Sequence, residues 1–182
     1  MIDENRLPSS REIIYTGKKI ELALDTLTLN DGTTAKREVV LHRGAVALVP
    51  MIDDDHVCLV RNVRYAVRTT LWEVPAGTID LNEPPDITAA RELIEETGYK
   101  AGKITKLREW FVSPGIISEV MHLYLCEALE QVGANLELDE NLEPVVFQWD
   151  EAMAMVADGR ICDAKTMLAL MMVDKLRKKQ IE

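Results

Sequence analysis

One short segment constrains the fold of this chain more than any other: it follows a pair of prolines and ends at Gly98. Glycine is the residue best suited to the left-handed conformation that ends a helix. Together with the helical periodicity between these signals, this predicts a helix over 86–97. Glu92, Glu95 and Glu96 are spaced at i, i+3 and i+4, so they lie on one face of that helix.

The opposite face of the predicted helix is apolar and can pack on a sheet. Its members are Ile87, Ala90, Leu93, Ile94 and Thr97. Three carboxylates that converge on the other face repel one another by about 0.2–0.5 kcal/mol per pair, a cost that a divalent cation would offset. Oxygen ligands without His or Cys suit Mg²⁺, or Mn²⁺ as the alternative. A solvated acidic face, partly paired with Arg91, is the other interpretation.

The remaining sequence favours strands followed by two helices in one compact unit. The turn Asn30-Asp31-Gly32 lies between two strands before Leu41, and this segment is a candidate arm. Further strands are predicted at 44–50, 56–61, 71–74, 104–112, 120–127 and 144–149, and helices at 150–157 and 163–178.

Charge and cysteine content exclude several classes of protein. A formal net charge of −10, from 31 acidic and 21 basic residues, argues against a broad surface for a nucleic acid polymer. No apolar stretch approaches the roughly 20 residues of a membrane span, and the amino terminus has no secretory pattern, so we expect a cytoplasmic protein without a membrane partner. Cys58, Cys126 and Cys162 are expected to be buried, reduced thiols.

Residues 77–99 carry the pattern of a known family. Gly77 is followed after five residues by Glu83, and after seven more by the run Arg91-Glu92-Leu93-Ile94-Glu95-Glu96-Thr97-Gly98-Tyr99. Every fixed position of the Nudix box is filled, so the chain resembles the Nudix hydrolases. The resemblance implies the α/β Nudix fold, a mixed β-sheet sandwiched between helices. We expect an N-terminal β arm over 1–41 and a catalytic domain over 42–182.

The resemblance to this family also implies a metal site. Glu92 and Glu96 would bind the metal ion directly, Glu95 would bind the metal or its water, and the carbonyl group of Ala76 would add one oxygen. The role of Glu83 stays open between support of the loop and support of the metal ligands.

Outside the box, the sequence is similar to the ADP-ribose pyrophosphatase branch of the family. The motifs Arg61–Val67 and Leu71–Gly77 lie upstream, Pro114 occupies the place of a marker proline, and 159–166 is also similar. This implies hydrolysis of the pyrophosphate bond of ADP-ribose or a related nucleoside diphosphate sugar. Members of the branch are commonly homodimers that exchange N-terminal strands, so we expect a homodimer, although a monomer with the arm folded on itself fits equally well.

The branch also suggests residues that act on the substrate. Glu119 is the candidate general base, with Glu95 as the alternative. An anionic substrate needs local cations in a protein of this net charge, and Arg64 is the candidate phosphate contact. Arg37 is expected to reach the substrate from the arm, and Tyr15 to stack on an adenine.

Two alternative functions stay open. The first is Nudix hydrolysis of GDP-mannose or dinucleoside polyphosphates, which the box does not separate from ADP-ribose. The second is a regulator with the Nudix fold that binds a nucleotide ligand without cleaving it. Three mutually repelling carboxylates disfavour the second, because binding alone does not need them.

Overall fold

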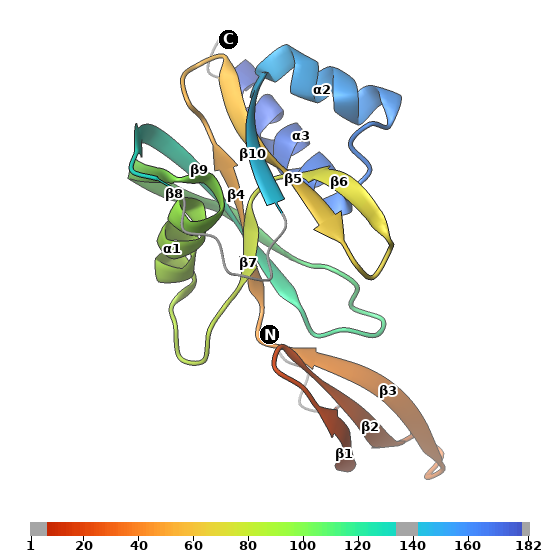
Figure 1. The fold of residues 1–182 in the computed structure, drawn as a ribbon. Helices are drawn as coiled ribbons and strands as arrows, with labels where there is room; N and C mark the ends of the chain where they lie inside the picture. Colours follow the sequence, from red (N-terminus) through yellow and green to blue (C-terminus); the bar gives the residue numbers. More distant parts are fainter. Residues whose placement is uncertain (1–6, 134–141, 180–182) are drawn as a thin grey trace. The chain divides into compact units, whose positions relative to one another are not determined.

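The computed structural model describes residues 7–133 and 142–179 (Figure 1). The elements, in order, are β1 (Ser10–Thr16), β2 (Ile20–Thr28), β3 (Thr34–His42), β4 (Ala45–Pro50), β5 (His56–Arg64), β6 (Thr69–Glu73), β7 (Ala76–Thr78), α1 (Pro85–Thr97), β8 (Tyr99–Phe111), β9 (Val120–Gln131), β10 (Leu142–Gln148), α2 (Trp149–Asp158) and α3 (Ala164–Lys179). They form two compact units, a smaller one of residues 1–44 with 111–120 and a larger one of residues 45–110 with 121–182. Within the described ranges, no helix is both long and apolar enough to cross a bilayer.

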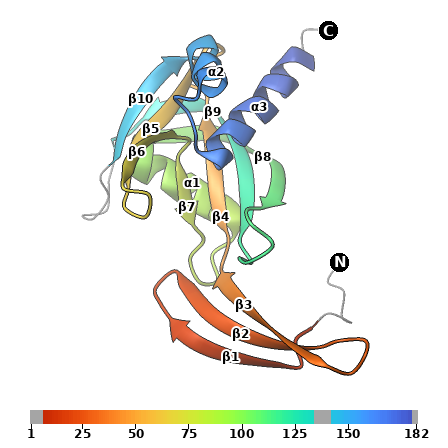
Figure 2. The ribbon, with the colours of Figure 1, turned by 90° about the vertical axis from the view of Figure 1, so that its right-hand side faces the viewer.

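Strand β4 is buried along its whole length and organises the larger unit. It pairs antiparallel with β7 and parallel with β9, in a sheet of order β7-β4-β9-β8. Because side chains alternate along a strand, Val46 and Leu48 enter one hydrophobic core with Leu93 of α1, while Ala47 and Val49 enter a second core. Helices α2 and α3 cover this second core (Figures 1 and 2). The mixed sheet therefore lies between helices, which confirms the predicted α/β fold.

A second sheet of the larger unit, of order β10-β5-β6, is antiparallel. In its register, Glu73 lies opposite Val60 of β5. Arg64 follows Val60 by four residues on the same strand, so it projects from the same face as Val60 and Glu73. The pleat of this sheet thus brings a cation and a carboxylate together at the ends of β5 and β6.

The smaller unit is an antiparallel sheet of order β1-β2-β3. The predicted turn at 30–32 joins β2 to β3, but an additional turn at Gly17, whose N–H donates to the Ile20 carbonyl at 2.8 Å, separates off β1. The loop 111–120 joins this unit through Ser118 N–H, which donates to Val40 O at 3.0 Å. The division into an arm over 1–41 and a domain over 42–182 stays a prediction.

Two expectations about burial are wrong. Ile87, predicted on the packed face of α1, is 53% exposed, because the buried arc is centred on Leu93 and includes Glu92 and Glu96 instead. Cys162 is exposed, because it lies in the connection between α2 and α3 rather than in a strand. Two further differences concern strands: β8 begins at residue 99 instead of 104, and the short β7 lies outside every predicted range.

An ion pair connects β1 to β2 in the smaller unit. The Nε and Nη2 groups of Arg11 donate to the two carboxylate oxygens of Asp25 at 2.6 and 2.7 Å, and Asp25 is only 5% exposed. Asp25→Asn removes the buried charge and is expected to lower the free energy of unfolding by about 1.5–3 kcal/mol, measured by urea denaturation. Glu12→Gln, on the exposed surface of β1, is the control and should change it by less than about 0.5 kcal/mol.

The same pair predicts a pH dependence. The Arg11 guanidinium, through its hydrogen bonds, holds the pKa of Asp25 below its usual value. Since the folded-state pKa is the lower one, the pair stabilises fully above the ordinary pKa of aspartate and loses this effect as the pH falls through the folded-state pKa. The difference between Asp25→Asn and the unaltered protein should therefore shrink in acid. A constant difference down to the lowest pH would contradict the assignment.

Candidate active site

Helix α1 positions the acidic residues of the box. It begins after Pro84, with a proline in its first turn, and ends at Gly98 in the left-handed conformation with φ 74°. On this helix, Glu92 and Glu96 are 7% and 4% exposed, whereas Glu95 is partly exposed. Two carboxylates are thus taken out of water, an arrangement that requires hydrogen bonds or cations around them.

Arg91 connects the acidic residues of the box. Its Nη1 donates to Glu92 Oε1 at 2.9 Å and to Glu95 Oε2 at 2.7 Å, and its Nη2 donates to Glu83 Oε2 at 3.0 Å. The hydrogen bond with Glu83 is the main cause that raises the pKa of Arg91, and the same contact lowers the pKa of Glu83. Glu83 also accepts a hydrogen bond from Thr88 at 2.8 Å. The geometry therefore makes Glu83 an anchor of Arg91, which in turn orients the other carboxylates.

The backbone at the start of β7 lies against the two buried glutamates. The N–H of Ala76 donates to Glu96 Oε2 at 3.0 Å. At Gly77, a Cβ atom would lie 1.9 Å from Cδ of Glu92, closer than any real side chain approaches. Glycine is required here because the main chain occupies the space of a side chain. The Nudix box glycine and its glutamates are therefore parts of one packed arrangement.

This arrangement fits a hard divalent cation. Glu92 and Glu96 offer carboxylate oxygens beside the Ala76 peptide group, and Mg²⁺ commonly takes one or two carboxylates together with waters and substrate phosphates. No group of three or more His, Cys, Asp or Glu side chains is gathered for a metal ion among the residues that the structure describes. Both Glu92 and Glu95 pair with Nη1 of Arg91, at 2.9 and 2.7 Å.

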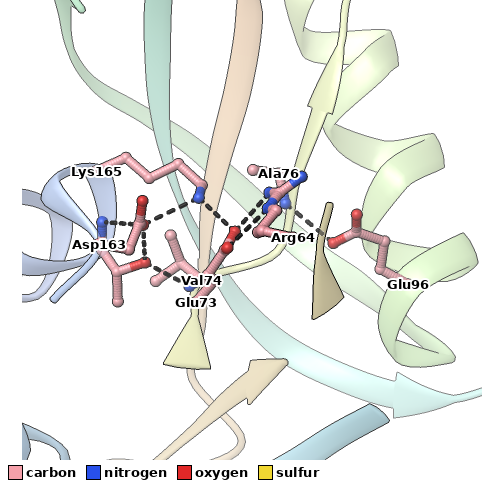
Figure 3. A network of polar contacts seen from close by, with 8 residues as sticks. Arg64, Glu73, Val74, Ala76, Glu96, Asp163 and Lys165 are labelled. Atoms are coloured by element: carbon pink, nitrogen blue, oxygen red, sulfur yellow. Dashed lines mark hydrogen bonds and ion pairs between the residues drawn. The ribbon is translucent and has the colours of Figure 1, made fainter. Parts of the chain in front are cut away.

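Arg64, the predicted phosphate contact, is held by a residue that sequence reasoning missed. Its Nε and Nη2 donate to the two carboxylate oxygens of Glu73 at 2.7 and 2.5 Å (Figure 3). Lys165 donates to the same carboxylate at 2.5 Å. The sequence signal for Glu73 is a charged residue inside the apolar run Leu71-Trp72-Glu73-Val74, where a side chain is expected to be buried and must then be paired.

The other three predicted residues lie in the smaller unit. Glu119 lies in the loop before β9, with a side chain 17% exposed and its Oε1 3.6 Å from Nδ1 of His42. Tyr15 is 59% exposed on β1, and Arg37 is exposed on β3, where its Nη1 donates to the Lys36 carbonyl at 2.9 Å. The remaining predicted site residues belong to the larger unit: Arg64, Ala76, Glu92, Glu95 and Glu96.

Comparison with known families identifies this arrangement. Residues 41–170 match the family model described as NUDIX domain. The match covers well over half of the chain and includes the glycine, the glutamates and the arginine of the box. The chain therefore belongs to the Nudix family.

Similar proteins place the chain more narrowly. It is 37% identical over 163 residues to an ADP-ribose pyrophosphatase of Bacillus subtilis (strain 168), covering 88% of each chain. It is 35% identical over 161 residues to a methanol dehydrogenase activator of Bacillus methanolicus, covering 87% of each. A crystal structure of an ADP compounds hydrolase superposes with a TM-score of 0.83 at 24% identity, covering 96% of this chain and 95% of the other, which shows the shared fold. The likeness to the ADP-ribose pyrophosphatase branch is thus confirmed.

Proposed function

We propose that this protein hydrolyses the pyrophosphate bond of ADP-ribose or a related nucleoside diphosphate sugar. The products are a nucleoside monophosphate and a sugar phosphate. The observation that carries the proposal is the close approach of the Ala76-Gly77 backbone to the buried carboxylates of Glu92 and Glu96. The likeness to an ADP-ribose pyrophosphatase over 88% of each chain supports the substrate class.

The residues of the larger unit act on the diphosphate, which is the electrophile of the reaction. Glu92, Glu96 and the carbonyl oxygen of Ala76 would hold Mg²⁺, with Mn²⁺ as the alternative, and Glu95 would bind the ion or its water. When bound, such an ion would supply positive charge to the diphosphate and lower the pKa of a water molecule. Arg91 keeps the glutamates in place, and Arg64 binds a phosphate oxygen.

Further residues are assigned to the nucleophile and the nucleoside. Glu119 accepts the proton of the attacking water, with Glu95 of the larger unit as the alternative base. Tyr15 stacks on the adenine, and Arg37 contacts the substrate. We further propose that the protein acts in the cytoplasm as a homodimer assembled through its N-terminal strands. With a net charge of −10, its partner is the small-molecule substrate and not a nucleic acid polymer.

The decisive experiment is a panel of nucleotides with the purified protein and Mg²⁺. ADP-ribose is expected to give AMP with the highest kcat/KM, ahead of GDP-mannose, UDP-glucose, ADP-glucose and diadenosine polyphosphates. EDTA should abolish hydrolysis and excess Mg²⁺ should restore it, because the carboxylates alone supply no positive charge to the diphosphate. Hydrolysis that ignores the chelator would refute the metal site. Binding of ADP-ribose without cleavage would favour a regulator.

The assignment of the base has a separate test. Glu119→Gln is expected to lower kcat by about 10²–10⁴-fold with little change in KM, because the amide no longer accepts a proton. Glu130→Gln, an exposed position near the end of β9, is the matched control and should leave kcat unchanged. Steady-state kinetics with ADP-ribose measures both. An unaltered kcat in Glu119→Gln would move the role to Glu95.

A further inference from the structure

The carboxylate of Glu73 is buried between two cations. Glu73 is 1% exposed, and it accepts three charge-assisted hydrogen bonds, two from Arg64 and one from Lys165 (Figure 3). Charged groups so fully removed from water are stable only when they are paired and hydrogen-bonded. Figure 3 shows the carboxylate of Glu73 between these two side chains, which come from β5 and α3.

The fork between Arg64 and Glu73 determines where the guanidinium group points. The contact uses Nε and Nη2, so Nη1 is outside the fork, and the side chain of Arg64 is 43% exposed. The hydrogen bond with Glu73 is the main cause that raises the pKa of Arg64, and the charges of Glu96 and Asp163 also contribute. Arg64 thus carries a fixed positive charge that interacts with a predicted metal ligand, and it has an edge left for an anion.

Lys165 is itself held at the start of α3. Its Nζ lies 2.9 Å from Asp163 Oδ2, and its side chain is 13% exposed. The same oxygen of Asp163 accepts the backbone N–H of Thr166 at 3.0 Å and so caps the helix. These contacts join two carboxylates and two cations in one cluster, whose formal net charge is zero. Its members are Arg64, Glu73, Asp163 and Lys165. Without Lys165, the cluster would carry a net negative charge beside a site that receives an anionic diphosphate.

We infer that Glu73 and Lys165 are positioning residues that hold Arg64 for the diphosphate of the substrate. Glu73 fixes the plane of the guanidinium group, and Lys165 compensates the charge of Glu73, so that the charge of Arg64 acts on the substrate. This inference rests on the proposed function, because it assigns the group that receives the phosphates.

The test measures binding, independently of turnover, with the non-hydrolysable analogue α,β-methylene-ADP-ribose and Mg²⁺ by calorimetry. Lys165→Met, which keeps the length of the side chain, is expected to raise Kd about tenfold, the effect of one lost charge-assisted interaction. Lys165→Arg, which keeps the charge but changes the shape, should stay within about threefold of the unaltered protein. Lys175→Met, on the exposed side of α3, is the control and should bind normally. If Lys165 served packing alone, Lys165→Met would bind the analogue nearly normally and Lys165→Arg would have the higher Kd.

The outcomes separate the two proposals. A protein that binds the analogue but hydrolyses no nucleotide of the panel refutes the proposed function, while the order of the Lys165 variants still decides this inference. Normal binding by Lys165→Met, or no binding by the unaltered protein, overturns the inference. If Lys165→Met does not fold, the double variant E73Q/K165M is measured instead, in which the charges again cancel but the fork to Arg64 is lost, and it is expected to raise Kd about tenfold. Binding within about threefold in that variant would overturn the inference.

Discussion

Glu96→Gln is expected to lower kcat for ADP-ribose by about 10²-fold or more while the melting temperature stays nearly unchanged. Glu96 is 4% exposed, and its Oε2 accepts the N–H of Ala76 at 3.0 Å. The glutamine oxygen can accept the same hydrogen bond, so the packing survives, but the negative charge that a divalent cation requires is gone. A bound metal contributes several kcal/mol to the transition state, and each 1.4 kcal/mol is about tenfold in rate.

AMP release and thermal unfolding measured on the same preparation test this expectation. Glu151→Gln, an exposed position in the first turn of α2, is the matched control and should preserve both quantities. Full activity in Glu96→Gln would refute its assignment as a metal ligand. Unfolding of that variant would assign the side chain a structural role instead.

Gly77→Ala is expected to damage both stability and catalysis. The added Cβ would lie 1.9 Å from Cδ of Glu92, so the carboxylate or strand β7 must move. Overpacking at a filled position costs about 1–3 kcal/mol of unfolding free energy. The displacement also separates the Ala76 peptide group from the glutamates, and we expect kcat to fall by about 10²-fold, since even a small misplacement of catalytic groups has such effects.

The control for this substitution is Gly115→Ala, because a Cβ there meets no atom within 4 Å. Its free energy of unfolding is expected to stay within about 0.5 kcal/mol of the unaltered protein. Urea denaturation and the Mg²⁺ dependence of kcat measure the two effects of Gly77→Ala. A Gly77→Ala protein with normal Mg²⁺ dependence would show that the close approach of the backbone is dispensable for the metal site.

The acidic helix was predictable because its signals are local. Pro84 before α1, Pro85 in its first turn and Gly98 after it indicate where the helix begins and ends, and the glutamate spacing follows from helix geometry. Its orientation was not predictable to the same degree. Spacing gives relative directions around a helix, but packing decides which arc is buried, so Ile87 is exposed while Glu92 and Glu96 face inward.

The contacts of Glu73 with Arg64 and Lys165 could not be predicted from the spacing of these residues in the sequence. Glu73 and Lys165 are 92 residues apart, and only the tertiary fold brings the start of α3 to the end of β6. Arg64 and Glu73 are nearer in sequence, but their contact depends on the register of β5 with β6, which the strand pattern does not determine. Long-range polar contacts of this kind have no local signal beyond a charged residue in an apolar run.

The hydrogen bond from the N–H of Val74 to Oγ1 of Thr166, at 2.9 Å, also has a consequence for biosynthesis. A ribosome produces the Nudix box well before it reaches Asp163, so the nascent polypeptide carries the acidic helix while the segment next to Ala76 still has no support from α3. The hydrogen bond that ties the end of the β6 segment to α3 can therefore form only after the whole box has been synthesised.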